Sequence, residues 1–135
     1  AFLMHYPKRR IPGHNRPASP TSPCDGSPAC RAACGQVCNH AEENVVLEWL
    51  RSGAARDGGH AFDVLHIEVD QDGEPLAFDR PGKPSRPSCI TCARLMFAAG
   101  VRCVWLLGVA GWRSWTAHEF LLETMAELGL PGGST

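Results

Sequence analysis

Two short motifs bring together residue types that can build a reactive zinc site. His40 and Glu42 are one residue apart, and Cys89 and Cys92 follow with two residues between them, starting 49 positions after the histidine. One imidazole and two thiolates supply three of the four ligands of tetrahedral zinc, so one coordination position stays open for water. Glu42 can act on that water as a base and then as an acid. The pattern therefore predicts catalysis rather than a purely structural metal site.

Both motifs lie at the predicted start of a helix. Apolar residues recur at helical spacing over Ala41–Arg51, and a glycine follows soon after. A second helical stretch covers residues 89–99 and is closed by Gly100. The unpaired amides and partial positive charge of a helix start favour a thiolate over a thiol, so we expect lowered pKa values for Cys89 and Cys92.

The segments between and after the motifs alternate between strands and helices. A β-branched run at residues 62–69 predicts a strand, and residues 76–78 follow a tight turn and can pair back on it. Residues 79–87 contain three prolines and predict a loop, residues 101–107 a strand covered on both faces, and residues 116–128 a last helix. We expect an α/β domain, whose ligands bind where strand ends meet helix starts.

Other interpretations of the histidine and glutamate pairs stay open. Asn39 can cap the first helix, with Glu42 reaching back to its backbone amide in a purely structural role. His66 and Glu68 repeat the same spacing inside the predicted strand, where alternate side chains point to one face. We expect these two to be a satisfied or exposed strand pair, because neither lies at a helix start.

Five cysteines lie outside the proposed site. An odd number cannot all pair within one chain, so the count does not indicate a secreted disulfide scaffold. We expect some of them to be buried apolar residues, and three recur every fourth position and would share one face of a helix. The five are Cys24, Cys30, Cys34, Cys38 and Cys103.

Two tryptophans, Trp112 and Trp115, precede the last predicted helix. Their rings can stack on a nucleic-acid base, which is a common way to hold single strands. The alternative interpretation is that both are partly buried core residues, as tryptophans often are.

Charge is distributed unevenly along the 135 residues, which are enough for one domain. The first 35 residues hold five of the 13 basic residues but one of the 14 acidic residues. Proline, serine and glycine are frequent there, so we predict a basic arm over residues 1–28 and a catalytic domain over residues 29–135. Such an arm can bind a polyanion in a salt-dependent way. No apolar run approaches the roughly 20 residues that span a bilayer, so we expect no membrane partner.

The two motifs resemble the signature of the zinc-dependent cytidine deaminase superfamily, H-x-E followed by P-C-x-x-C, each at the start of a helix. Here the proline is displaced by one position, because Ser88 lies between Pro87 and Cys89. More narrowly, the H-A-E-E-N opening and the S-C-x-x-C form are similar to the bacterial toxin deaminases at the C-terminus of secreted polymorphic toxins. The resemblance covers about residues 37–130.

The resemblance implies a three-layer, cytidine-deaminase-like fold with helices on both faces of a central mixed sheet. The strand pair that opens this fold would take one strand from residues 1–6. It also implies that His40, Cys89 and Cys92 hold Zn2+ and that Glu42 shuttles protons.

The implied activity is hydrolytic deamination of cytosine to uracil in nucleic acid, in which water adds at C4 and ammonia leaves. The Ala41 amide and the Ser88 backbone would contact the base edge, with Trp112 and Trp115 as further substrate-binding candidates. A base must leave its stack to enter the site, so single-stranded DNA is favoured. RNA, duplex DNA and free nucleosides are the alternative substrates.

By the same resemblance, the chain is a toxin domain that a bacterium secretes or delivers and that acts in the target-cell cytoplasm. An immunity protein would then be a partner. The alternative from a different class is a non-catalytic, zinc-stabilised binding module. In that case a fourth residue, with Cys38, His66 and Cys103 as candidates, closes the coordination sphere.

Overall fold

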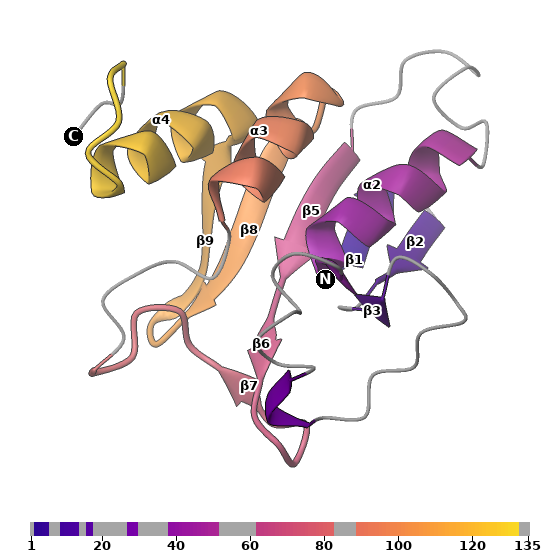
Figure 1. Ribbon diagram of the computed structural model, residues 1–135, viewed down its shortest axis with the longest axis vertical. Helices are drawn as coiled ribbons and strands as arrows, with labels where there is room; N and C mark the ends of the chain where they lie inside the picture. The colour runs from indigo at the N-terminus through magenta and orange to yellow at the C-terminus, as the bar shows by residue number, and fades with distance from the viewer. Residues whose placement is uncertain are drawn as a thin grey trace.

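A five-stranded mixed sheet carries the helices α2, α3 and α4 on one of its faces (Figure 1). The computed structural model describes residues 2–5, 9–13, 16–17, 27–29, 38–51, 62–82 and 89–132. None of the helices in these ranges is both long and apolar enough to cross a membrane. In chain order the elements are β1 (Phe2–His5), β2 (Arg9–Pro12), β3 (Arg16–Pro17), β4 (Cys38–Asn39), α2 (Ala41–Arg51), β5 (Phe62–His66), β6 (Glu68–Val69), β7 (Pro75–Leu76), α3 (Ile90–Ala98), β8 (Cys103–Gly108), β9 (Gly111–Thr116) and α4 (Ala117–Glu127).

The strand directions place the starts of α2 and α3 at the same edge of the sheet. The strand order is β2-β1-β5-β8-β9, in which β5 and β8 are parallel and the other neighbours are antiparallel. A parallel pair needs a crossover connection, and α3 lies on it, so α3 starts near the end of β5. Helix α2 precedes β5 and runs in the opposite direction. Both helix starts therefore lie at the carboxyl end of β5 (Figure 1).

The hydrophobic core lies between the sheet and these helices. Val64, Val104 and Trp115 are neighbours in register on the covered face, and all three are buried. Val45 of α2 and Phe120 of α4 are fully buried in the same core. The predicted α/β class with a mixed sheet is confirmed. A helical layer on the opposite face is not formed by α2, α3 or α4 and stays a prediction.

Most of the predicted elements occur within two residues of their expected bounds. The helix over Ala41–Arg51 is confirmed as α2, and the helices expected at residues 89–99 and 116–128 are α3 and α4. The strand expected at residues 62–69 is interrupted at Ile67 and forms β5 and β6. Strand β7 pairs back on β6, as the turn between them predicts.

Strand β9 is an element that the sequence pattern does not reveal. It forms an edge of the sheet and pairs with β8 from Thr116 back to Gly111. Three consecutive side chains in it, Trp112, Arg113 and Ser114, are exposed. The alternation of buried and exposed residues that marks a half-buried strand is therefore missing, and pairing with β8 defines the strand instead.

Two strands that precede residue 28 belong to the central sheet. Strand β1 pairs with β5 on one side and with β2 on the other, so the strand expected at residues 1–6 is present. Gly13 follows β2 and approaches α2 closely: a Cβ there would lie 2.5 Å from Val45 Cγ1 and 3.0 Å from the Ala41 carbonyl oxygen. The boundary at residue 28 stays a prediction, but the segment before it is more than a charged arm.

Deletion of residues 1–13 should destabilise the fold, because it leaves one edge of β5 unpaired. Loss of the pairing between β1 and β5 should lower the free energy of unfolding by on the order of 2–4 kcal/mol, measured by urea unfolding. The double variant Arg9→Gln with Arg10→Gln keeps both strands and should stay within about 0.5 kcal/mol of the unaltered chain. An unchanged urea midpoint after the deletion would contradict this role of β1.

A charged contact fixes β5 against β8. Asp63 is buried, and its carboxylate accepts hydrogen bonds from Nε and Nη2 of Arg102, both at 2.8 Å, and from Trp105 Nε1 at 3.1 Å. Burial alone would raise the pKa of Asp63, but the hydrogen bonds and the charge of Arg102 hold it below its ordinary value of 3.8. The folded chain therefore favours the ionised carboxylate.

Asp63→Asn should lower the free energy of unfolding by roughly 1–3 kcal/mol at neutral pH, because it removes charge-assisted hydrogen bonds. A carboxyl group whose pKa is lowered by folding stabilises the folded chain at pH values above its ordinary pKa. This stabilisation is lost as the pH falls through the pKa of the folded state. The difference in thermal stability between the unaltered chain and Asp63→Asn should therefore become smaller below about pH 4. Asp72 lies in an exposed turn and offers a control, because Asp72→Asn should change the free energy of unfolding little. A gap that widens in acid would contradict the assignment.

Candidate metal centre

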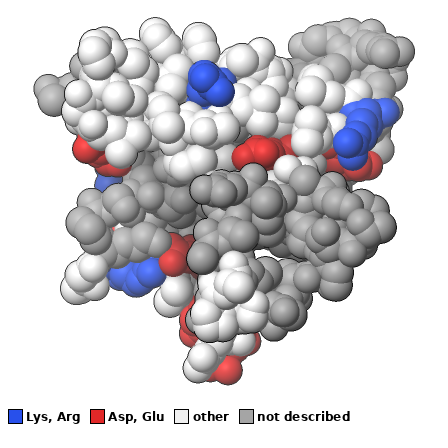
Figure 2. Space-filling view, in the orientation of Figure 1, with Lys and Arg blue, Asp and Glu red and all other residues white. Residues whose placement is uncertain are grey.

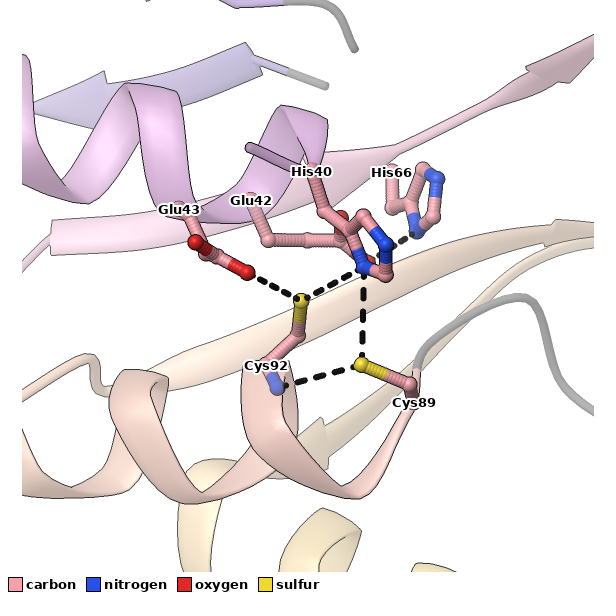
Figure 3. Close-up of polar contacts among 6 residues, drawn as sticks. All are labelled: His40, Glu42, Glu43, His66, Cys89 and Cys92. Carbon is pink, nitrogen blue, oxygen red and sulfur yellow. Dashed lines mark hydrogen bonds and ion pairs between the residues drawn. The ribbon is translucent and has the colours of Figure 1, made fainter. Parts of the chain in front are cut away.

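The candidate metal ligands project from the starts of α2 and α3 (Figure 3). His40 directly precedes α2, and its carbonyl oxygen accepts a helical hydrogen bond from the Asn44 amide at 3.0 Å. Cys89 is the N-cap of α3, and its carbonyl oxygen accepts from the Ala93 amide at 3.0 Å. Both motifs therefore begin at an N-cap position, as their predicted place at helix starts requires.

The distances among the three donor atoms suit one tetrahedral zinc ion. His40 Nδ1 lies 3.3 Å from Cys92 Sγ and 3.5 Å from Cys89 Sγ. All three donor atoms lie within 4.8 Å of one another. Zinc bonds of about 2.0 Å to nitrogen and about 2.3 Å to sulfur place those two atoms roughly 3.5 Å apart at a tetrahedral angle. The predicted set of His40, Cys89 and Cys92 is therefore a group that can hold a metal ion, compatible with zinc.

No fourth protein ligand completes this set within the described part of the chain. Its histidine, cysteine and acidic side chains include no other member within ligand spacing. His66 stays outside the group, and Cys103 lies at the far end of β8, opposite Thr116 in β9. The geometry therefore disfavours His66 and Cys103 as closing ligands. Only the backbone of Cys38 is described, in β4, so its side chain lies outside this comparison.

The thiol of Cys92 is not activated by its place in the first turn of α3. Burial raises the pKa of Cys92, and the nearby charges of Glu42, Cys89 and Glu43 raise it further. The Cys92 thiol lies 3.8 Å from Glu43 Oε1, which accepts from it, while the Cys92 amide donates to Cys89 Sγ at 3.4 Å. The expected lowering of the Cys92 pKa is therefore wrong. Deprotonation must accompany metal binding.

Glu42 lies in the first turn of α2, next to the ligand set. Its side chain is 3% exposed and extends past His40 toward His66 (Figure 3). The alternative of a cap at Asn39 is disfavoured, because the His40 carbonyl oxygen accepts the first helical bond and the Asn39 side-chain Nδ2 donates to Asn44 Oδ1 at 3.4 Å.

The single strand expected to carry both His66 and Glu68 is interrupted between them, although neither joins the metal group. His66 ends β5, whereas Glu68 begins β6 and accepts hydrogen bonds from Arg80 at 3.0 and 3.4 Å. His66 is instead 12% exposed, and its Nδ1 lies 3.0 Å from Glu42 Oε1. The break in the strand at Ile67 separates the two residues. No feature of the local sequence signals the contact between His66 and Glu42, because it depends on how α2 lies over β5.

The two tryptophans differ in exposure. Trp115 is 8% exposed, its Nε1 donates to Glu123 Oε2 at 3.0 Å, and its ring packs edge-on against Phe78 and Phe120. This burial argues against base stacking and agrees with the core alternative. Trp112 is 43% exposed, so it keeps a ring surface that a base can reach.

The other predicted substrate contacts are described only in part. Ala41 is the first residue of α2 and is buried beside the ligand set. Ser88 lies outside the described residues, so its place at the site stays a prediction. The same holds for Cys24, Cys30 and Cys34, and Cys38 lies in a strand rather than on a shared helical face.

Arg113 is a neighbour of the site that the sequence does not single out. Leu106 pairs with His66 on one side and with Arg113 on the other, so all three lie in one row across the sheet. The guanidinium of Arg113 lies 5.4 Å from the Phe78 ring centre and 5.1 Å from that of Trp115, which are cation-π distances. The exposed guanidinium of Arg113 is therefore held in place on β9, two strands away from His66 on β5.

Comparison with protein-family models, with curated proteins and with solved structures finds no match for this chain. The basis for a functional proposal is therefore the geometry of the ligand set together with the resemblance of its two motifs.

Zinc binding should depend on the three ligands and should release protons. The unaltered chain should bind about one zinc ion, and Cys92→Ala should lower the affinity at least 100-fold. Because the pKa of Cys92 is raised, binding at pH 7 should release at least one proton and should strengthen as pH rises. Calorimetry in buffers of different ionisation enthalpy measures both quantities. Cys103→Ala is the matched control, and equal losses in the two variants would contradict the assigned ligand set.

Proposed function

We propose that this chain is a zinc-dependent hydrolytic deaminase that converts cytosine to uracil in nucleic acid. The observation that carries the proposal is the convergence of His40 Nδ1 and two cysteine sulfurs at zinc-ligand spacing, with a buried glutamate beside them. A structural zinc site has four protein ligands, whereas a catalytic one keeps a position open. The described residues favour the second arrangement.

The chain's own residues have distinct roles in this proposal. His40, Cys89 and Cys92 would hold zinc, which supplies an activated water by lowering its pKa to about 7. Glu42 takes a proton from the water that adds to C4 of cytosine and gives it to the departing amine, so ammonia leaves and uracil remains. The low exposure of Glu42 strengthens its electrostatic interaction with a bound cation.

The proposed fold is the three-layer architecture of the cytidine deaminase superfamily. The strand order and the parallel pair β5 and β8, with both motifs at helix starts on one edge, support it. In α/β folds, this edge is where ligands bind. Helices on the second face of the sheet belong to the proposal rather than to the described residues.

The substrate we favour is single-stranded DNA, with RNA, duplex DNA and free nucleosides as the alternatives. Described Lys and Arg side chains are separated from one another on the face seen in Figure 2 and form no continuous basic patch there. Binding to a polyanion would then use the basic residues of the first 35 positions and the exposed Arg113 for phosphates, and the exposed ring of Trp112 for a base.

The biological setting we propose is that of a bacterial toxin domain, delivered into the cytoplasm of a target cell and blocked by an immunity protein. Its support is the likeness of the H-A-E-E-N and S-C-x-x-C motifs to those of toxin deaminases. A toxin that deaminates nucleic acid could also act on the nucleic acid of the cell that produces it, so that cell would need an immunity protein.

Glu42→Gln should retain one zinc ion and the fold but lower the rate of ammonia release by roughly 10²–10⁴-fold, the usual contribution of an acid-base residue. The zinc-loaded chain is incubated with single-stranded DNA, duplex DNA, RNA and cytidine, and uracil is quantified by mass spectrometry. Glu48→Gln, an exposed position on the same helix, is the matched control and should keep full activity.

The pattern across substrates decides between the alternatives. Turnover on oligonucleotides but not on cytidine supports the nucleic-acid assignment, and equal turnover on both would favour a nucleoside deaminase. Stoichiometric zinc with no uracil from any of the four substrates would contradict the deaminase proposal and would favour a binding module.

A further inference from the structure

The pair formed by His66 and Glu42 is a buried contact that the proposed ligand set does not use. His66 Nδ1 lies 3.0 Å from Glu42 Oε1, and the two side chains are 12% and 3% exposed. The residues come from different elements, since His66 ends β5 and Glu42 lies in the first turn of α2. A buried polar pair of this kind needs a reason, because an unsatisfied group would cost free energy.

The position of His66 in the sheet explains why it reaches Glu42. Val64 and His66 are two residues apart in β5 and therefore point to the same face, which α2 and α3 cover. Val64 is fully buried in the core, and His66 stands one step further toward the edge where the helix starts converge. The imidazole thus lies beside the start of α2, next to the Glu42 carboxylate (Figure 3).

His66 has no competing role among the described residues. It stays outside the metal group, and Glu68, its neighbour at matching spacing, is bound by Arg80. Its Nδ1 is buried and makes no well-aligned hydrogen bond in the described part of the chain, the contact with Glu42 included. The 3.0 Å contact itself is close but not yet aligned, which is common for catalytic contacts before substrate binds.

We propose that His66 is a positioning residue that holds Glu42 Oε1 through an Nδ1–H donor. This inference rests on the proposed deaminase function. A carboxylate has two oxygens, so a donor that holds Oε1 at His66 orients Oε2 for proton exchange with water and the leaving amine. A donor that holds one carboxylate oxygen restricts rotation about the last side-chain bond and helps to keep the group in reacting geometry. His66 itself does not touch the substrate.

The activity test uses amide replacements that distinguish the two imidazole nitrogens. The amide nitrogen of asparagine lies near the position of Nδ1, and that of glutamine lies near the position of Nε2. His66→Ala and His66→Gln should lower kcat roughly 10–100-fold with little change in KM and unchanged zinc content, as loss of a supporting partner does. His66→Asn should restore most of kcat. Equal kcat in all four proteins would overturn the proposal.

A double-mutant cycle separates positioning from a general packing effect. In a Glu42→Gln background, His66→Ala should cause no further loss of kcat, because the group that it positions is already gone. An additive loss in the double variant would show that His66 acts by another route and would overturn the proposal.

A second readout does not depend on turnover. Side-chain ¹⁵N NMR of the zinc-loaded chain should show His66 with its proton on Nδ1, and Glu42→Gln should shift that signal. A neutral His66 protonated on Nε2 would overturn the proposal. If Nδ1 is protonated and coupled to Glu42 but no substrate is deaminated, the pairing stands and the deaminase assignment fails, so the two failures are distinguishable.

Discussion

Three donor atoms from two helix starts must lie at zinc-ligand spacing, and the sheet topology is what brings them there. The parallel pairing of β5 with β8 requires α3 to begin at the carboxyl end of β5, and α2 begins at the same end because it runs antiparallel to β5. His40 and Cys89, which are 49 residues apart, consequently occupy adjacent N-cap positions. Asp63 and Arg102 hold the two strands together, so the core and the site share one framework.

The electrostatics of the ligand set favour a cation. Burial raises the pKa of Cys92, and the nearby negative charges of Glu42, Cys89 and Glu43 raise it further. A divalent cation reverses this repulsion and converts the thiols into ligands. Zinc binding and local order are therefore expected to be coupled.

The sequence predicts those parts of the molecule that local pattern encodes. The ligand set and the bounds of α2, α3 and α4 follow from motif spacing and helical periodicity, and the structure agrees with them. Features formed by long-range pairing escape this approach. Consecutive exposed side chains in β9 remove the alternating pattern by which a strand is predicted. The contact of His66 with Glu42 depends on the packing of α2 over β5. Burial of Cys92 likewise outweighs the helix-start effect that local context predicts.

The N-terminal segment also shows that composition does not predict long-range strand pairing. Its basic and proline-rich composition favours an arm, yet β1 and β2 join the sheet, and Gly13 contacts α2 at a distance that only glycine permits. Composition describes how a segment interacts with solvent, whereas strand pairing depends on a partner elsewhere in the chain. Residues 1–28 therefore combine charge with structure, and any function of the charge must be tested with the strands intact.

X-ray absorption spectroscopy at the zinc edge of the loaded chain tests the open coordination position most directly. The geometry predicts two sulfurs at about 2.3 Å and two nitrogen or oxygen ligands at about 2.0 Å, one of them a water that an added anion displaces. A first shell of three sulfurs, or a spectrum that no small anion alters, would show a site closed by four protein ligands and would contradict a catalytic centre.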